Sequence, residues 1–360
     1  MTKKQVGRMI AFALAVCLLL ILLCEVFELS DNSYIPSRFK TFYSLEENTL
    51  DAVFIGTSGV DRYWVSAKAY EEYGMTVYPL ASNGIPAWLY INVIEEVYKT
   101  QNPELIILDM RAYGQTPSAK SMESRARNVL DAMDFFSINR VKAAFKTMEV
   151  LQEKNDEESG FDLSFLLSFI KYHAKWADED FSLYDNVCNV ECPYMGFFMY
   201  KTLSVKTKKN KATVYDNDYY KDMDSFSEDA LYELLDYAEE KNINLLFVDT
   251  PRMADKDNMG RSNTAYRILE ERGFPYINYS QTDETGNFTH IANLDHNHDF
   301  YNNNHVNYYG AEKFTATFSS YLNENYDFED HRSDEAVKVQ WDGVYSTIQK
   351  KIKKWEDAKK

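Results

Sequence analysis

An uncharged apolar run near the N-terminus limits where the rest of this chain can fold. Residues 9–24 carry no charge and consist mainly of Leu, Ile, Ala, Val and Phe. Counting on through residue 27 gives the roughly 20 apolar residues that a membrane-spanning helix needs. We therefore expect a transmembrane anchor over residues 9–28, after a short cytoplasmic segment at residues 1–8.

The charges on either side of this run predict its orientation. Lys3, Lys4 and Arg8 precede it, whereas acidic residues follow it. This asymmetry places the N-terminus in the cytoplasm and everything after about residue 28 outside the cell membrane. A cleaved signal peptide would also start with a basic segment, but residues 22–25 lack the small side chains that cleavage requires. A single-pass, uncleaved anchor is the favoured interpretation.

The rest of the chain has no second apolar run of that length. The formal net charge of −17 of the whole chain, and the lack of a basic cluster outside the flank of the anchor, argue against nucleic acid as a partner. Cys188 and Cys192 are spaced i, i+4, so a disulfide and two free thiols both stay open. This pair alone offers too few ligands for a metal site.

Short apolar runs that end in turn residues indicate buried strands. We expect strands at residues 51–58, 75–80, 105–108, 244–250 and 275–279. Helical spacing of apolar residues appears at residues 88–100, 227–241 and 266–272. Strands that alternate with helices in this way predict a parallel sheet with helices on its faces, which is a three-layer α/β/α sandwich.

The domain boundaries follow from where this alternation starts, breaks and resumes. We expect a polar connector at 29–47, one α/β domain at 48–330, and a helical insertion within it at about 115–225. A C-terminal helix is expected within 331–360. Its apolar stripe is formed by Trp341, Val344, Ile348, Ile352 and Trp355.

Two polar residues at opposite ends of this domain could carry chemistry. Ser58 follows the first strand, and open parallel sheets place their sites at the carboxyl edge. A serine hydroxyl is a weak nucleophile that needs a nearby base, which is usually histidine. His305 lies on a polar loop just before the last helix of the domain, where it can face that edge.

These segments resemble the SGNH/GDSL hydrolase family, which has an early strand ending Gly-x-Ser and a late His-x-Asn-x-x-Gly. Within the family, the chain is similar to the membrane-anchored branch that includes the D-alanyl transfer protein of teichoic-acid modification and alginate-type O-acetylation proteins. The resemblance covers roughly residues 48–325, discontinuously, and implies a flavodoxin-like sandwich. It also implies that Ser58 is the nucleophile and His305 the base. Gly84 would help to form the oxyanion hole with Ser58, and Asn83 could add a donor.

The sequence departs from the family pattern at two places. The family's acid lies three residues before the histidine, and here that position is Asn302. Asp299 and Asp295 are the alternative acids near in sequence. The family's Gly-x-Asn-Asp block has no match, and Arg111 stands in roughly that place, as an oxyanion donor, a pocket residue or the partner of a carboxylate.

Other polar residues near the strand ends leave alternatives open. Arg252 follows a strand and either lines the pocket, as Asp299 could, or sits on a surface turn. His296 and His298, flanked by acids, indicate a polar loop, so we expect no metal and no cofactor.

The resemblance implies a serine esterase or O-acyltransferase, most simply for acetyl, that acts outside the cell on a cell-surface glycan. Its partners would be that glycan, an acyl donor and a membrane-bound O-acyltransferase. Because of Asn302, the alternative is a catalytically weak SGNH-like domain that binds glycan or scaffolds the O-acyltransferase. A purely structural envelope protein is a third hypothesis.

Overall fold

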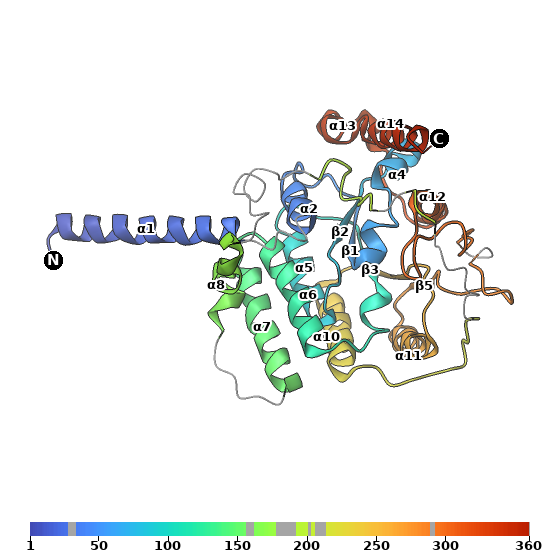
Figure 1. Cartoon of the computed structure of the whole chain (residues 1–360), viewed down its shortest axis with the longest axis horizontal. Helices are drawn as coiled ribbons and strands as arrows, with labels where there is room; N and C mark the ends of the chain where they lie inside the picture. Colours follow the sequence, from blue (N-terminus) through green and yellow to red (C-terminus); the bar gives the residue numbers. More distant parts are fainter. Residues whose placement is uncertain are drawn as a thin grey trace.

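Five short parallel strands form the centre of the protein (Figure 1). The computed structural model describes residues 1–27, 34–155, 162–177, 192–200, 203–205, 214–288 and 292–359. The strand order is β2-β1-β3-β4-β5, and every neighbouring pair is parallel. The strands are β1 (Ala52–Gly56), β2 (Val77–Ala81), β3 (Leu105–Asp109), β4 (Leu245–Asp249) and β5 (Tyr276–Asn278). The predicted α/β class and parallel sheet are confirmed.

The burial of the strands explains why they read as continuous apolar runs. Every residue of β1, β2, β3 and β4 is buried, because side chains on both faces of the sheet are covered. Val53 and Ile55 belong to one apolar cluster, whereas Ala52 and Phe54 belong to another. Successive side chains of a strand point to opposite faces, so each face has its own core.

Helices supply the other side of each core. The cluster around Val53 includes side chains of α2 (Tyr34–Tyr43), α5 (Tyr90–Val97), α6 (Ala119–Ala132), α7 (Ile138–Asn155), α10 (Ser225–Lys241) and α11 (Lys256–Arg272). The cluster around Phe54 includes side chains of α4 (Ser66–Tyr73), α12 (Tyr308–Asn325) and α14 (Val344–Asp357). The short elements are α3 (Ser58–Asp61), α8 (Ser168–Tyr172) and single turns of 3₁₀-helix at Ala87–Leu89, Met110–Ala112, Leu163–Phe165, His173–Ala177 and His331–Ser333.

The first helix, α1 (Lys3–Val26), is long and apolar enough to cross a membrane. It projects away from the rest of the protein in Figure 1, and large apolar side chains such as Phe12 and Leu18 are exposed along it. Among the described residues, its carboxyl end is the part that meets the domain, where Cys24 and Val26 are buried. The Ser168 hydroxyl of α8 donates a hydrogen bond of 3.2 Å to the Cys24 carbonyl.

The polar connector expected at 29–47 contains a helix, so that part of the prediction is wrong. In α2, Ile35, Phe39 and Phe42 lie at helical spacing and are fully buried against the sheet. Arg38 is buried with them. Its guanidinium pairs with Asp61 of α3 at 2.8 Å. Of the turn residues that suggested a connector, Asp31 and Asn32 lie outside the described residues, whereas Pro36 lies in the first turn of α2 and is buried.

The C-terminal segment forms two helices rather than the single one expected. α13 (Glu335–Trp341) is followed by its C-cap residue Asp342, and α14 begins after Gly343. Gly343 has a left-handed backbone conformation, with φ of 75°, which breaks the helix between them. The predicted apolar stripe still forms a contact surface, since Trp341, Ile348 and Ile352 are buried.

The helical content expected at 115–225 is found in α6, α7 and α8, although parts of that range lie outside the described residues. These helices lie on the connection between β3 and β4. Cys192 is a free cysteine. Cys188, its candidate disulfide partner, lies outside the described residues.

Candidate active site

Ser58 lies where β1 ends, at the carboxyl edge of the sheet. Thr57 caps the short helix α3, because its hydroxyl accepts a hydrogen bond of 3.1 Å from the Gly59 amide. The Thr57 amide donates to Asp109 Oδ2 at 3.1 Å, and the Thr57 hydroxyl donates to the same oxygen. Asp109 ends the neighbouring strand β3. Two adjacent strand ends therefore fix the turn that presents Ser58.

His305 meets Ser58 from the far end of the chain. Its Nε2 lies 2.7 Å from Ser58 Oγ, across 247 residues of sequence. An antiparallel bridge between Phe300 and Val306 closes the loop that carries the histidine. The Tyr301 ring stacks on the imidazole with their centroids 5.6 Å apart. The loop is thus held so that the imidazole faces the serine.

Asn302 contacts the other nitrogen of this imidazole. Its Oδ1 lies 3.1 Å from His305 Nδ1 and also accepts a hydrogen bond of 2.8 Å from the Asn304 amide. Because Oδ1 is an acceptor, His305 Nδ1 must carry the proton that it donates. Nε2 is then unprotonated and can accept the Ser58 hydroxyl proton. Asn302 selects the tautomer that a general base needs, although a neutral amide cannot stabilise the imidazolium.

The surroundings of His305 disfavour its charged form. Burial is the main cause that lowers the pKa of this imidazole, and the positive charges of Arg111 and Arg62 lower it further, to about 2. The imidazole is therefore neutral at physiological pH. It can accept a proton in the ground state, but the imidazolium that forms during the reaction is poorly stabilised.

This low pKa predicts an unusual pH dependence. A histidine base that titrates near its ordinary pKa loses activity as the pH falls through about 6.5. Since the pKa of His305 is lowered to about 2, we expect the rate of Ser58 acylation to lack this fall between about pH 8 and pH 5. The second-order rate constant for labelling by a fluorophosphonate measures it. A fall of about tenfold or more centred near pH 6.5 would contradict the lowered pKa.

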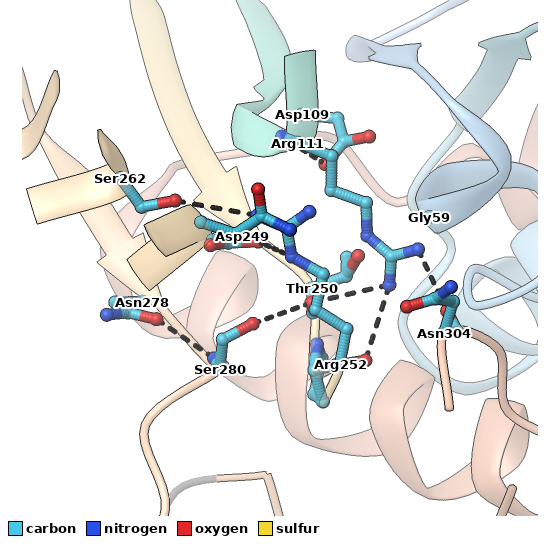
Figure 2. Close-up of polar contacts among 12 residues, drawn as sticks. Gly59, Asp109, Arg111, Asp249, Thr250, Arg252, Ser262, Asn278, Ser280 and Asn304 are labelled. Carbon is cyan, nitrogen blue, oxygen red and sulfur yellow. Dashed lines mark hydrogen bonds and ion pairs between the residues drawn. The ribbon is translucent and has the colours of Figure 1, made fainter. Parts of the chain in front are cut away.

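Arg111 contacts the loop that carries His305 and the segment that follows β4. It is buried, its guanidinium donates to the Asn304 carbonyl at 2.9 Å, and it also reaches the carbonyls of Thr250 and Pro251 (Figure 2). It also lies 4.9 Å from the centroid of the Tyr63 ring. These contacts join the ends of β3 and β4 to the histidine loop. Arg111 therefore positions His305, rather than acting mainly as the partner of a carboxylate.

The alternative acids do not contact His305. Asp299 is buried, and its carboxylate binds Lys313 Nζ at 2.9 Å and the Asp295 amide at 2.7 Å. Asp295 pairs with His298 at 2.6 Å. Asp299 thus stabilises the loop rather than lining the cavity. The remaining histidine of this region, His290, lies outside the described residues.

A cavity of about 740 Å³ opens beside Ser58 and His305. Asn83 and Gly84 line it, and their role in an oxyanion hole stays a prediction. The Asn83 side chain accepts a hydrogen bond from the Tyr34 hydroxyl. Within the described part of the chain, the Gly84 amide donates to no acceptor. The Ser58 amide, in the first position of α3, has no intrahelical acceptor either. Both amides are available as donors to an oxyanion.

The cavity also contains one residue whose place the sequence left open and others that the sequence did not indicate. Arg252 lines it and is buried, so the alternative of a surface arginine is wrong. Gln115, Arg125 and Asn258 line it as well. Arg125 and Gln115 come from the connection between β3 and β4, where no strand end or motif marks them. No local pattern in the sequence could have assigned these residues to the site.

The sequence matches no protein-family model and no curated protein. The class of protein must therefore be inferred from the site itself. A serine and a histidine in contact at the carboxyl edge of a parallel sheet, with unused amides beside them, have the parts needed for acyl chemistry.

Proposed function

We propose that this chain is a serine esterase or O-acyltransferase of the SGNH type, with a three-layer α/β/α sandwich as its domain. One observation carries the proposal, which is the 2.7 Å contact between Ser58 Oγ and His305 Nε2. A serine hydroxyl becomes a useful nucleophile when a base is within hydrogen-bond reach. The Asn302 contact supports it, since it leaves Nε2 free to accept the proton.

The proposed reaction has two balanced steps. Ser58 Oγ attacks the acyl carbonyl, and His305 Nε2 takes the hydroxyl proton. The tetrahedral intermediate, stabilised by the amides of Ser58 and Gly84, collapses, and His305 returns the proton to the leaving group. An acceptor hydroxyl or water then attacks the acyl-serine, and His305 takes its proton. The second tetrahedral intermediate collapses and releases the new ester, or the carboxylic acid when water attacks, as His305 returns the proton to Ser58. Transfer and hydrolysis differ only in which acceptor arrives.

The proposed substrate follows from where the domain is held. With α1 in the cell membrane and the basic residues before it in the cytoplasm, the domain faces outward, where the acceptor is a cell-surface glycan. The acyl group is then acetyl in the simplest case. A membrane-bound O-acyltransferase is the partner that would bring the acyl donor across the membrane.

Labelling by a fluorophosphonate tests this proposal directly. The full chain in detergent is treated with the reagent, and the adduct is mapped by mass spectrometry. We expect one adduct on Ser58, because the reagent reports serines activated by a base, and we expect its loss in His305→Ala. Ser121→Ala is the matched control, since Ser121 lines the same cavity but its hydroxyl has no hydrogen bond to a histidine among the described residues. Labelling at Ser121, or none on folded protein, would sink the proposal.

A specific observation also favours a second function. Asn302 occupies the place of the acid, and the pKa of His305 is lowered to about 2. Both features weaken the base. The alternative is therefore a glycan-binding or scaffold domain that assists a membrane O-acyltransferase and has little chemistry of its own.

A further inference from the structure

The cavity beside Ser58 has a positively charged wall. Arg111, Arg125 and Arg252 line it, and Asp255 supplies the one carboxylate among the described residues that line it. Asp255 is engaged as the cap of α11, where it accepts hydrogen bonds of 2.8 Å and 3.0 Å from Asn258. The protein as a whole has a formal net charge of −17. A positive cavity in an acidic protein concentrates anions at that place.

Arg125 has no acidic partner in the part of the chain that the structure describes. Its guanidinium donates to Gln115 Oε1 at 3.0 Å, and among the described residues it forms no ion pair. Burial lowers the pKa of this guanidinium below its ordinary value. A partly buried cation without a counter-ion is unfavourable, so an anionic ligand at this position would be stabilised.

Arg252 is buried more deeply and is also incompletely paired. It is 4% exposed, and its Nε has no hydrogen-bond acceptor in the part of the chain that the structure describes. Within the described part of the chain, the carboxylate that pairs with Arg252 is Asp249, whose Oδ1 lies 3.7 Å from Arg252 Nε (Figure 2). This oxygen accepts no hydrogen bond there, while the other oxygen, Oδ2, accepts one of 2.8 Å from the Tyr266 hydroxyl. The only hydrogen bond of the guanidinium among the described residues is a long one, 3.5 Å, to Ser262 Oγ.

The position of Arg125 connects this wall to the reacting groups. Arg125 lies across the loop that carries Gly84, so closely that a Cβ at Gly84 would come within 2.9 Å of Arg125 Cδ. The absence of a side chain at Gly84 is what lets the arginine lie there. A ligand group held by Arg125 would therefore lie beside the amide that we assign to the oxyanion hole.

We propose that Arg125 and Arg252 form a subsite for an anionic group of the substrate, a carboxylate or a phosphate. The planar fork of donors on arginine matches both groups, and charge-assisted hydrogen bonds of this kind are the strong ones. The subsite deepens the proposed function, on which it rests for its role in the reaction. The acceptor is then an acidic glycan, and its charge places a nearby hydroxyl in front of Ser58.

Equilibrium binding to the full chain in detergent tests the subsite without any acyl donor. Galacturonate and glycerol phosphate are the probes, and they distinguish a carboxylate from a phosphate source. Galactose and glycerol are the matched neutral compounds. We expect at least one anionic probe to bind, with an affinity that falls as salt is added, and no binding of its neutral partner.

Substitutions locate the binding. Arg125→Gln is expected to weaken binding of the anion by about tenfold or more, and Arg125→Lys by less, because lysine keeps the charge but loses the fork. Arg252→Gln should act in the same direction, with thermal unfolding to verify that the variant folds. Arg267→Gln is the control, since Arg267 lies on the same helix as Asn258 but is exposed. Equal binding by Arg125→Gln and the unmodified chain would overturn the subsite.

The two proposals can fail separately. Anion binding that depends on Arg125, in a chain that gives no fluorophosphonate adduct, would leave the subsite standing and reject acyl chemistry. An adduct on Ser58 without binding of either anion would reject the subsite and leave the acyl chemistry standing.

Discussion

Asn302→Asp is expected to raise the rate of Ser58 acylation by about 10- to 100-fold. The variant places a carboxylate where Asn302 Oδ1 now lies, 3.1 Å from His305 Nδ1. A negative charge there stabilises the imidazolium that forms as Ser58 loses its proton, and it raises the lowered pKa of His305. Asn302 is exposed, so water screens part of the effect and the gain is smaller than a buried acid would give.

The measurement is the second-order rate of fluorophosphonate labelling across pH. In Asn302→Asp, a fall in rate at acid pH should appear that the unmodified chain lacks, because the base now titrates in the accessible range. Asn303→Asp is the matched control, since it adds the same charge one residue away without facing Nδ1. If the two variants behave alike, the contact at Nδ1 does not limit the base.

The outcome also decides between the two proposed functions. If the unmodified chain reacts and Asn302→Asp reacts faster, the native site is a working but weak triad. If only Asn302→Asp reacts, the native domain has lost its chemistry, and the binding or scaffold function gains support.

The sheet was predictable because strands that are buried on both faces appear in the sequence as continuous apolar runs. Strands such as β1 and β3 are short apolar runs that end in polar residues, and they form as expected. The same logic located Ser58 and His305, since a strand end and a helix start meet at one edge of a parallel sheet. Their catalytic roles stay predictions, although the two side chains lie in contact.

The part of the cavity wall formed by Gln115 and Arg125 was not predictable, because tertiary contacts rather than local patterns bring these residues there. Arg125 lies in the middle of a helix, and an arginine on a helix usually faces solvent. Helix α2 was missed for a related reason. Its buried Arg38 breaks the apolar pattern, and the charge that balances it, Asp61, lies on a different element.

Arg38→Met is expected to destabilise the protein by about 3–5 kcal/mol. Arg38 and Asp61 are both fully buried and pair at 2.8 Å, so removing the cation leaves a buried carboxylate without a counter-charge. The Arg38 guanidinium also donates to the carbonyls of Gly196 at 2.8 Å and Ala81 at 2.5 Å, which would lose their donor. Because Asp61 belongs to α3, which begins at Ser58, labelling of Ser58 should fall as well.

Denaturant unfolding of the full chain in detergent measures this destabilisation. Lys40→Met is the matched control on the same helix, since Lys40 and Glu25 form a partly exposed pair at 3.3 Å that contributes less than about 1 kcal/mol.

The double variant Arg38→Met with Asp61→Asn should be more stable than Arg38→Met alone, because the second change removes the unbalanced charge. The loss in free energy of unfolding of the double variant could instead equal the sum of the losses of Arg38→Met and Asp61→Asn. The ion pair between Arg38 and Asp61 would then not stabilise the contact between α2 and the turn of Ser58. The stability of that turn would then depend on the Thr57 contacts with Asp109.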